Sequence, residues 1–228
     1  MGCLRNIQRK ILHTVARQRI LAGGLWFVDI PRTSSSAVRA WLFEAAGYPH
    51  GKFHGLSAAG KRQGFFPDHT TAREVRRFLG ASAWDRLVTF SLVRNPFDRF
   101  ASLYLYYRHT EKTFDGSFAE FCGFFVGLKK CSEKIRTLRT IWMSQTEFLS
   151  ERRGALVVKH ICKYENRHSD LTKIAKTQNL PLPSPSVINP SPHKPPEGLR
   201  SLYDAKTAGI IRQEFADDFA RFSYSENL

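Results

Sequence analysis

The clearest pattern in the chain is a short apolar run followed at once by a polar turn and then by a helical periodicity. The run, residues 87–93, is rich in β-branched and aromatic residues, which favours a strand buried on both faces. It ends at Arg94, followed by Asn95, which suits an N-cap, and Pro96, which suits a first helical turn. Apolar residues then recur at three- and four-residue steps over 97–107, which predicts a helix.

The same order of strand, turn and helix occurs nearer the start of the chain. Residues 25–30 predict a buried strand, residues 31–36 (Pro-Arg-Thr-Ser-Ser-Ser) form a hydroxyl-rich turn, and residues 37–43 begin an amphipathic helix. In an open α/β sheet, ligands bind where parallel strands end and helices begin. Backbone amides at a helix N-terminus favour an anion there, and Arg32 adds positive charge. A serine-capped helix without a ligand is the alternative interpretation.

Arg94 and Ser102 are candidates for a second anion contact. Arg94 lies where the second strand passes into its helix, and a guanidinium binds phosphate through two parallel hydrogen bonds. Ser102 follows about two helical turns later, so its hydroxyl can face the same ligand. The competing interpretation pairs Arg94 with a carboxylate and gives Ser102 no role. The triphosphate-binding pattern GxxxxGK[ST] is not present, because no glycine occurs between Asp29 and Gly47.

The other segments predict more helices and one more strand around the same sheet. Thr71 and Glu74 form a capping box that starts a helix over about 72–79, and Asp204 caps a last helix over 205–222. Helical patterns also cover 114–127, 136–142, 145–149 and 168–179, an apolar strand is predicted over 155–161, and the proline-rich segment 181–196 is a loop. The predicted fold class is α/β: a P-loop-like three-layer sandwich with a central, mainly parallel sheet flanked by helices.

The start of the chain is basic and amphipathic over residues 4–21. We favour a helix packed against the domain, and the alternative is a helix lying on an anionic membrane surface. We therefore divide the chain into this N-terminal helix, residues 1–22, and one domain, residues 23–228.

Composition and charge narrow the possible functions without choosing one. The chain has 228 residues and a net charge of +15, which favours polyanionic partners. The cysteines lack zinc-finger spacing, and no apolar run reaches the roughly 20 residues of a membrane span. We recognise no nucleic-acid-binding motif.

Taken together, the motifs resemble the carbohydrate sulfotransferase family, which uses 3′-phosphoadenosine 5′-phosphosulfate (PAPS). The segment VRNPFDRFASLY, residues 93–104, is similar to the 3′-phosphate motif of that family almost residue for residue. The turn at residues 31–36 resembles the 5′-phosphosulfate motif Pro-Lys-Thr-Gly-Ser/Thr-Ser/Thr, but has Arg32 for lysine and Ser34 for glycine. Further similar segments are 69–72 (His-Thr-Thr-Ala), 161–166 (ending in Tyr-Glu-Asn), 189–191 and 215–224.

The resemblance implies a role for each motif residue. Arg94 and Ser102 would hold the 3′-phosphate. The loop residues Arg32, Thr33, Ser34, Ser35 and Ser36 would hold the 5′-phosphosulfate, with Arg32 as the cation that neutralises charge in the transition state. The product would be 3′-phosphoadenosine 5′-phosphate (PAP), and the scheme requires no metal.

The acceptor hydroxyl needs a general base, and we predict His69, because histidine titrates near neutral pH. The alternatives for the base are His54 and Glu165. The acceptor is expected to be a carbohydrate or another hydroxyl compound.

Three other interpretations stay open at this point: a kinase-like nucleotide-binding enzyme, a non-enzymatic basic module that binds polyanions, and a family member that binds nucleotide with weak catalysis. The departures at Arg32 and Ser34 motivate the last of these. Relatives in the Golgi carry an N-terminal anchor that we do not find here. We therefore expect a cytoplasmic protein, and the alternative of peripheral contact with the inner membrane surface through residues 4–21 stays open.

Overall fold

Three parallel strands form the centre of the molecule. A computed structural model describes residues 14–18, 20–46, 69–131, 142–183 and 193–228. Its sheet has the order β1-β2-β3, with β1 at Leu25–Val28, β2 at Val88–Val93 and β3 at His160–Lys163. Val28 lies opposite Ser91, and Val93 lies opposite Lys163, so the carboxyl ends of the strands meet at one edge. This arrangement confirms the predicted α/β class.

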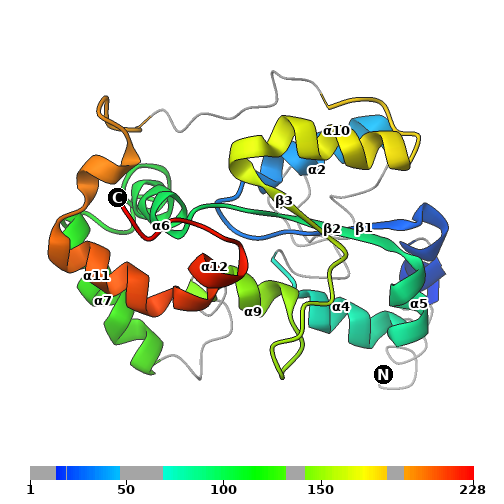
Figure 1. Ribbon diagram of the computed structural model, residues 1–228, viewed down its shortest axis with the longest axis horizontal. Helices are drawn as coiled ribbons and strands as arrows, with labels where there is room; N and C mark the ends of the chain where they lie inside the picture. Colours follow the sequence, from blue (N-terminus) through cyan, green and yellow to red (C-terminus); the bar gives the residue numbers. More distant parts are fainter. Residues whose placement is uncertain (1–13, 19, 47–68, 132–141, 184–192) are drawn as a thin grey trace, which may run out of the picture.

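Helices cover both faces of the sheet (Figure 1). On one side lie α2 (Ser35–Ala46) and α10 (Arg167–Thr177), and on the other lie α4 (Ala72–Leu79), α5 (Ala81–Arg86) and α9 (Gln145–Leu149). The remaining helices gather beyond the carboxyl ends of the strands: α6 (Pro96–Leu105), the π-helical turn η1 (Tyr106–Thr110), α7 (Phe118–Cys131), α11 (Ala205–Glu214) and α12 (Ala216–Arg221). Two short 3₁₀ turns are η3 (Tyr164–Asn166) and η4 (Leu199–Leu202).

The buried side chains form three hydrophobic clusters, which explains the three groups of helices. Alternate residues of β1 point to opposite faces, as the period of a strand requires. Leu25 and Phe27 pack with α2 and α10, whereas Trp26 and Val28 pack with α4, α5 and α9. The third cluster joins α6 to α7, α11 and α12 and is rich in phenylalanine.

The described part of the N-terminal segment is helical and packs against the domain. Residues 14–18 and 20–23 are helical, and Ala16 and Ile20 belong to the core cluster beneath the sheet. Val15, which the sequence pattern placed on the apolar face, is 39% exposed. Residues 4–13, where most of that face lies, are outside the described residues.

Three segments differ from the sequence-based expectations. The third strand was predicted over 155–161 but starts at His160, because Val157 and Val158 pack into the core below the sheet and Leu156 forms an isolated bridge with Ser150. The last helix was predicted as one piece, but it breaks at Phe215, whose backbone leaves the helical region (φ −121°, ψ 26°). The short helix α5 was not predicted. The expected helix over 136–142 falls almost entirely outside the described residues.

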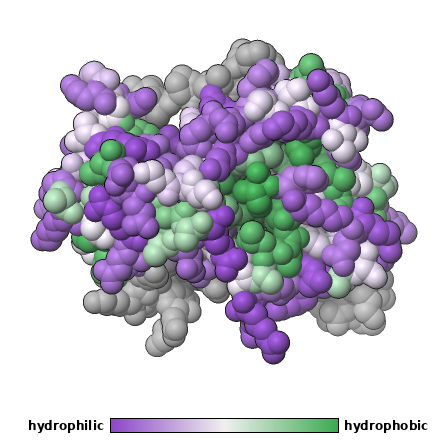
Figure 2. All heavy atoms as spheres, viewed as in Figure 1, coloured by the Kyte–Doolittle hydropathy of each residue, from purple (hydrophilic) through white to green (hydrophobic). Residues whose placement is uncertain are grey.

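The outer surface is mainly hydrophilic in the view of Figure 2. An apolar area lies near the middle of this view, where Figure 1 places β3 and the neighbouring chain. Within the described residues, no helix combines the length and the apolar character that crossing a membrane requires.

Candidate functional site

The candidate site lies where the three strands end. The turn of residues 31–34 follows β1, Arg94 follows β2, and Tyr164 follows β3. Because β2 is the central strand, Arg94 lies between the other two strand ends. The site therefore has the location at which ligands bind in open α/β sheets.

The turn after β1 has an unusual backbone that brings it directly into a helix. Arg32 and Ser34 both adopt left-handed conformations, with φ of 67° and 72°. The Thr33 hydroxyl donates a hydrogen bond of 2.9 Å to the Ile30 carbonyl, so it stabilises the turn itself. Helix α2 begins at Ser35. The first amides of a helix have no partners within the helix, so this turn presents donors to an anion.

Arg32, Arg94 and Ser102 come together although they lie on different elements. The Nε and Nη2 atoms of Arg32 donate to the Ser102 Oγ over 3.2 and 3.1 Å. Arg94 Nη1 donates to the Arg32 carbonyl over 3.2 Å. The Nε of Arg94 is buried and has no hydrogen-bond partner within the described part of the chain. A buried donor in this state is suited to an anionic ligand.

The two guanidiniums are stacked on aromatic rings rather than paired with acids. Arg32 lies 4.7 Å from the Tyr106 ring centroid, and Arg94 lies 4.2 Å from that of Tyr164. In the described residues, neither arginine forms an ion pair with a carboxylate. Burial lowers the pKa of both groups, and the charge of Arg94 lowers the pKa of Arg32 further. Asp98 and Glu165 offset part of the Arg94 charge from a distance, but two neighbouring cations without an ion-paired carboxylate among the described residues favour an anionic ligand.

Arg99 fixes the turn from below. Its side chain is 5% exposed, and its Nε donates to the Pro31 carbonyl over 3.1 Å. Its two Nη atoms donate to the Met143 carbonyl, each over 3.2 Å. Burial lowers the pKa of Arg99 to about 10, so the group stays charged at neutral pH. Arg94 and Arg99 thus hold the carbonyls of two consecutive residues of the turn, Arg32 and Pro31.

The backbone of Arg94 is held by α9. Gln145 is fully buried, accepts from the Arg94 amide over 2.8 Å and donates to the Arg94 carbonyl over 2.8 Å. Asp218 of α12 accepts from the amides of Gln145 and Thr146, each over 2.8 Å. This network fixes the position from which the Arg94 side chain extends.

Glu165, one of the predicted alternatives for the general base, is occupied by structural contacts. One carboxylate oxygen accepts from the Asn95 amide over 3.1 Å, and the other accepts from the Tyr224 hydroxyl over 2.9 Å. Burial is the main reason that the pKa of Tyr224 is raised, and its hydrogen bond to Glu165 adds to the effect. Glu165 therefore links α6 to the end of the chain. His54, the other alternative, is outside the described residues.

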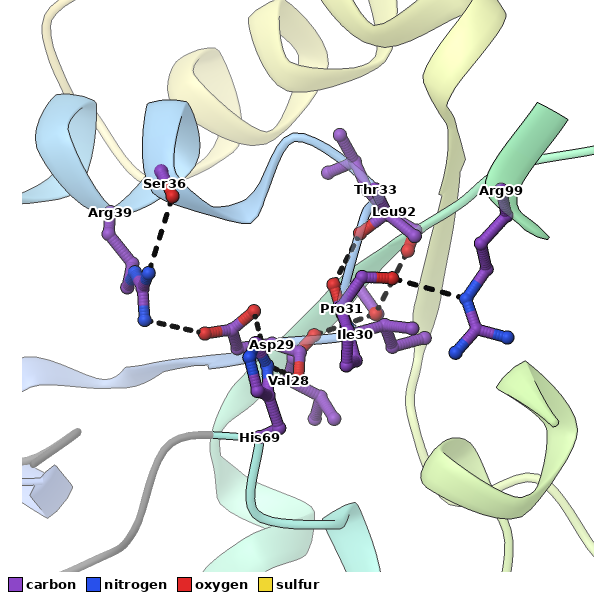
Figure 3. Close-up of polar contacts among 11 residues, drawn as sticks. Val28, Asp29, Ile30, Pro31, Thr33, Ser36, Arg39, His69, Leu92 and Arg99 are labelled. Carbon is purple, nitrogen blue, oxygen red and sulfur yellow. Dashed lines mark hydrogen bonds and ion pairs between the residues drawn. The ribbon is translucent and has the colours of Figure 1, made fainter. Parts of the chain in front are cut away.

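His69 contacts the end of β1 rather than solvent alone (Figure 3). Its Nδ1 lies 3.2 Å from Asp29 Oδ1 and 3.3 Å from the Asp29 carbonyl oxygen. The other Asp29 oxygen accepts from Arg39 over 2.8 Å, and Arg39 also reaches Ser36 over 3.4 Å. Burial lowers the pKa of His69, but the charge and hydrogen bonds of Asp29 outweigh it, so that pKa is raised above its ordinary value of 6.5.

The structure thus brings the predicted residues to one edge of the sheet, in two adjoining groups. Arg32, Arg94 and Ser102 form the first group, and His69 lies in the second. The residues that support them had no role predicted from the sequence: Asp29, Arg39, Arg99, Gln145 and Asp218. Asp29 did carry a signal, because it is an acidic residue within an otherwise apolar predicted strand. Arg99 and Asp218 lie within the family-like segments 93–104 and 215–224, but their partners, like those of Gln145, lie far away in the sequence.

Comparison with known proteins identifies the family to which this arrangement belongs. A family model with the description "Sulfotransferase family" matches residues 57–225. The matched range includes Arg94 and Ser102, and it begins after the turn that follows β1. An Archaeoglobus fulgidus protein described as "Uncharacterized protein" is 27% identical over 112 residues, covering 47% of this chain and 80% of its own. No solved structure matches. Since the family match spans more than half of the chain, the protein belongs to the sulfotransferase family and is a PAPS-dependent transferase.

Proposed function

We propose that the protein transfers a sulfonyl group from PAPS to a hydroxyl of a carbohydrate acceptor. The observation that carries this proposal is the joining of Arg32, Arg94 and Ser102: Arg32 donates to Ser102 and Arg94 donates to the Arg32 carbonyl, and in the described residues neither guanidinium forms an ion pair with a carboxylate. A nucleotide with phosphates at both its 3′ and 5′ ends carries negative charge that can pair with these two guanidiniums. PAPS, when bound, supplies the sulfonyl group.

The donor-binding residues divide into two sets. Arg94 and Ser102 are proposed to hold the 3′-phosphate, because the buried Nε of Arg94 still has a hydrogen bond to donate. Ser34, Ser35 and Ser36, with the first amides of α2, are proposed to hold the 5′ end. The hydroxyl of Thr33 is already used within the turn, so its contribution is to the shape of the loop.

Arg32 connects the two sets. Its backbone belongs to the turn after β1, while its guanidinium reaches Ser102 on α6. We propose that Arg32 neutralises the negative charge that the bisphosphate gains as it leaves. A cation in that place stabilises the transition state more than the ground state, which is the condition for a faster reaction.

His69 is proposed to be the general base. It takes the proton from the acceptor hydroxyl as the oxygen of that hydroxyl bonds to sulfur and the bond from sulfur to the bisphosphate breaks. Glu165 is less suited to the task, because both of its oxygens already accept hydrogen bonds. A carbohydrate acceptor follows from the family resemblance, and the net charge of +15 favours one that is already acidic.

The first experiment is thermal unfolding of the purified protein with PAP, with 5′-AMP and ATP as controls. A ligand present at about 100 times its Kd stabilises the native state by about 2.7 kcal/mol. For a chain of this size, that corresponds to a rise in Tm of about 5–11 °C. We expect this rise with PAP and a much smaller one with 5′-AMP, since 5′-AMP lacks the 3′-phosphate.

Two variants make this experiment specific to the site. Arg94→Ala is expected to abolish the PAP response, while Arg152→Ala, at an exposed turn, is expected to keep it. An equal response to all three nucleotides, or none to PAP, contradicts the proposal and favours a basic polyanion-binding module. A strong PAP response without sulfonyl transfer to any of a panel of sugars would identify a nucleotide-binding member with weak catalysis.

A further inference from the structure

The carboxylate of Asp29 is completely buried at the end of β1. Burying a charge is unfavourable unless the charge is paired and hydrogen-bonded. Asp29 Oδ2 accepts a hydrogen bond from Arg39 Nη1 over 2.8 Å, and Oδ1 lies at ion-pair distance, 3.2 Å, from His69 Nδ1, which also lies 3.3 Å from the Asp29 carbonyl oxygen. The arrangement spans three segments, because Asp29 follows β1, Arg39 lies on α2, and His69 precedes α4 (Figure 3).

We infer that Asp29 is a positioning residue that holds His69 in the tautomer and orientation required of a general base. This inference rests on the proposed function, since it concerns the proton that His69 accepts there. With Nδ1 facing the Asp29 carboxylate and carbonyl, the proton of neutral His69 is on Nδ1. The other ring nitrogen, Nε2, then carries the lone pair that accepts a proton from the acceptor.

The backbone at His69 supports a fixed position for the ring. His69 has a φ of 58°, a left-handed conformation that residues other than glycine seldom adopt. It is directly followed by the buried residues Thr70 and Thr71, and Thr71 forms the capping box of α4 with Glu74. Strained conformations of this kind persist when the surrounding structure determines them, and they gather at functional sites.

The pair adjoins the turn that is proposed to hold the 5′ end of the nucleotide. Asp29 lies two residues before Pro31, and Arg39 connects its carboxylate to Ser36 in the first turn of α2. The His69 side chain is 28% exposed, so the ring is accessible while its Nδ1 edge faces Asp29. The described charged groups that act on His69 are Asp29, which raises its pKa, and Arg39, which lowers it.

The test that does not depend on the acceptor is NMR of the histidine rings. Long-range ¹H–¹⁵N spectra distinguish the two neutral tautomers, and His69→Gln assigns the signal among the eight histidines. We expect wild-type His69 to be protonated on Nδ1 when neutral. In Asp29→Asn, the pKa of His69 is expected to fall, because a nearby opposite charge is removed, and the share of the Nδ1-protonated tautomer is expected to fall, because the carboxylate that favours it is gone. Asp85→Asn, at an exposed position on α5, is the matched control.

Kinetics provides the second readout once an acceptor has been found. Asp29→Asn is expected to lower kcat by about 10²-fold or more with little change in KM for PAPS, and to move the acidic limb of the pH profile to lower pH. Asp29→Asn combined with His69→Ala is expected to be no slower than His69→Ala alone, since the two residues act as a unit.

The outcomes separate this inference from the proposed function. Wild-type His69 protonated on Nε2, or a tautomer and pKa that are unchanged in Asp29→Asn, would overturn the inference even if PAP binds tightly. Loss of PAP binding by the wild type would instead contradict the proposed function. If Asp29→Asn does not fold, the wild-type spectrum alone still decides the tautomer.

Discussion

Ser34→Gly is expected to stabilise the protein, although it removes a hydroxyl from the proposed site. Ser34 has a φ of 72° in the turn before α2. A left-handed backbone costs a residue with a Cβ roughly 1–2 kcal/mol, and it costs glycine almost nothing. The carbonyl of Ser34, which accepts from the Ala37 and Val38 amides, is unaffected by the change.

The expected gain is smaller than the strain, because glycine also loses more backbone freedom on folding, by roughly 0.5–1 kcal/mol. The net stabilisation is then about 0.5–1 kcal/mol, which corresponds to a rise in Tm of about 1–4 °C for a chain of this size. Differential scanning calorimetry resolves such a rise. PAP should stabilise the variant nearly as much as the wild type, since Ser35, Ser36 and the first amides of α2, which are proposed to hold the 5′ end, are all retained.

Two control variants isolate the backbone effect. Ser34→Ala removes the same hydroxyl but keeps the Cβ, so its Tm should lie at or below that of the wild type. Ser36→Gly places glycine within the first turn of α2, where it should be destabilising by roughly 0.5–1 kcal/mol. If Ser34→Gly were no more stable than Ser34→Ala, backbone strain at this position would not be the reason for the glycine in the motif of the relatives.

Two further predictions concern the arginines. Arg99→Met should lower the free energy of unfolding by about 3–5 kcal/mol, because the carbonyls of Pro31 and Met143 lose their donors and Asp218 loses a buried counter-charge; denaturation in urea measures this, and a loss below about 1 kcal/mol would contradict it. Arg32→Lys restores the lysine of the related motif, yet it should weaken PAP binding about tenfold in calorimetric titration, because lysine cannot make the forked contact with Ser102. Equal or tighter binding would show that the fork has no part in holding the nucleotide.

Local features of the fold were predictable where one short segment contains the whole signal. The capping box of Thr71 and Glu74 starts α4, and Asn95 with Pro96 starts α6, as the sequence indicated. The third strand was placed too early, because the apolar residues before it pack under the sheet instead of pairing within it. The break at Phe215 was not predictable from the periodicity, since the apolar pattern continues through it.

In the candidate site, too, features set by one short segment could be predicted, and contacts between distant segments could not. The positions of Arg94 and Ser102 at the end of β2 and on the next helix could be predicted, because Arg94 directly precedes the N-cap of α6 and Ser102 lies on that helix. The contact between Arg32 and Ser102 joins residues 70 positions apart, and no local pattern reports it. Asp29 was treated as part of a buried strand, and its contact with His69, 40 positions away, is visible only in the structure.

The contacts of Arg94 and Arg99 with the turn after β1 have a consequence for how related proteins evolve. Arg94 and Arg99 donate hydrogen bonds to the carbonyls of Arg32 and Pro31. The motif of residues 93–104 therefore fixes the backbone of the motif of residues 31–36, although the two are far apart in the chain. A substitution in one motif should therefore be tolerated or rejected according to the residues present in the other. Grafting the turn between relatives is expected to succeed when both arginines, with their surroundings, are transferred together with it.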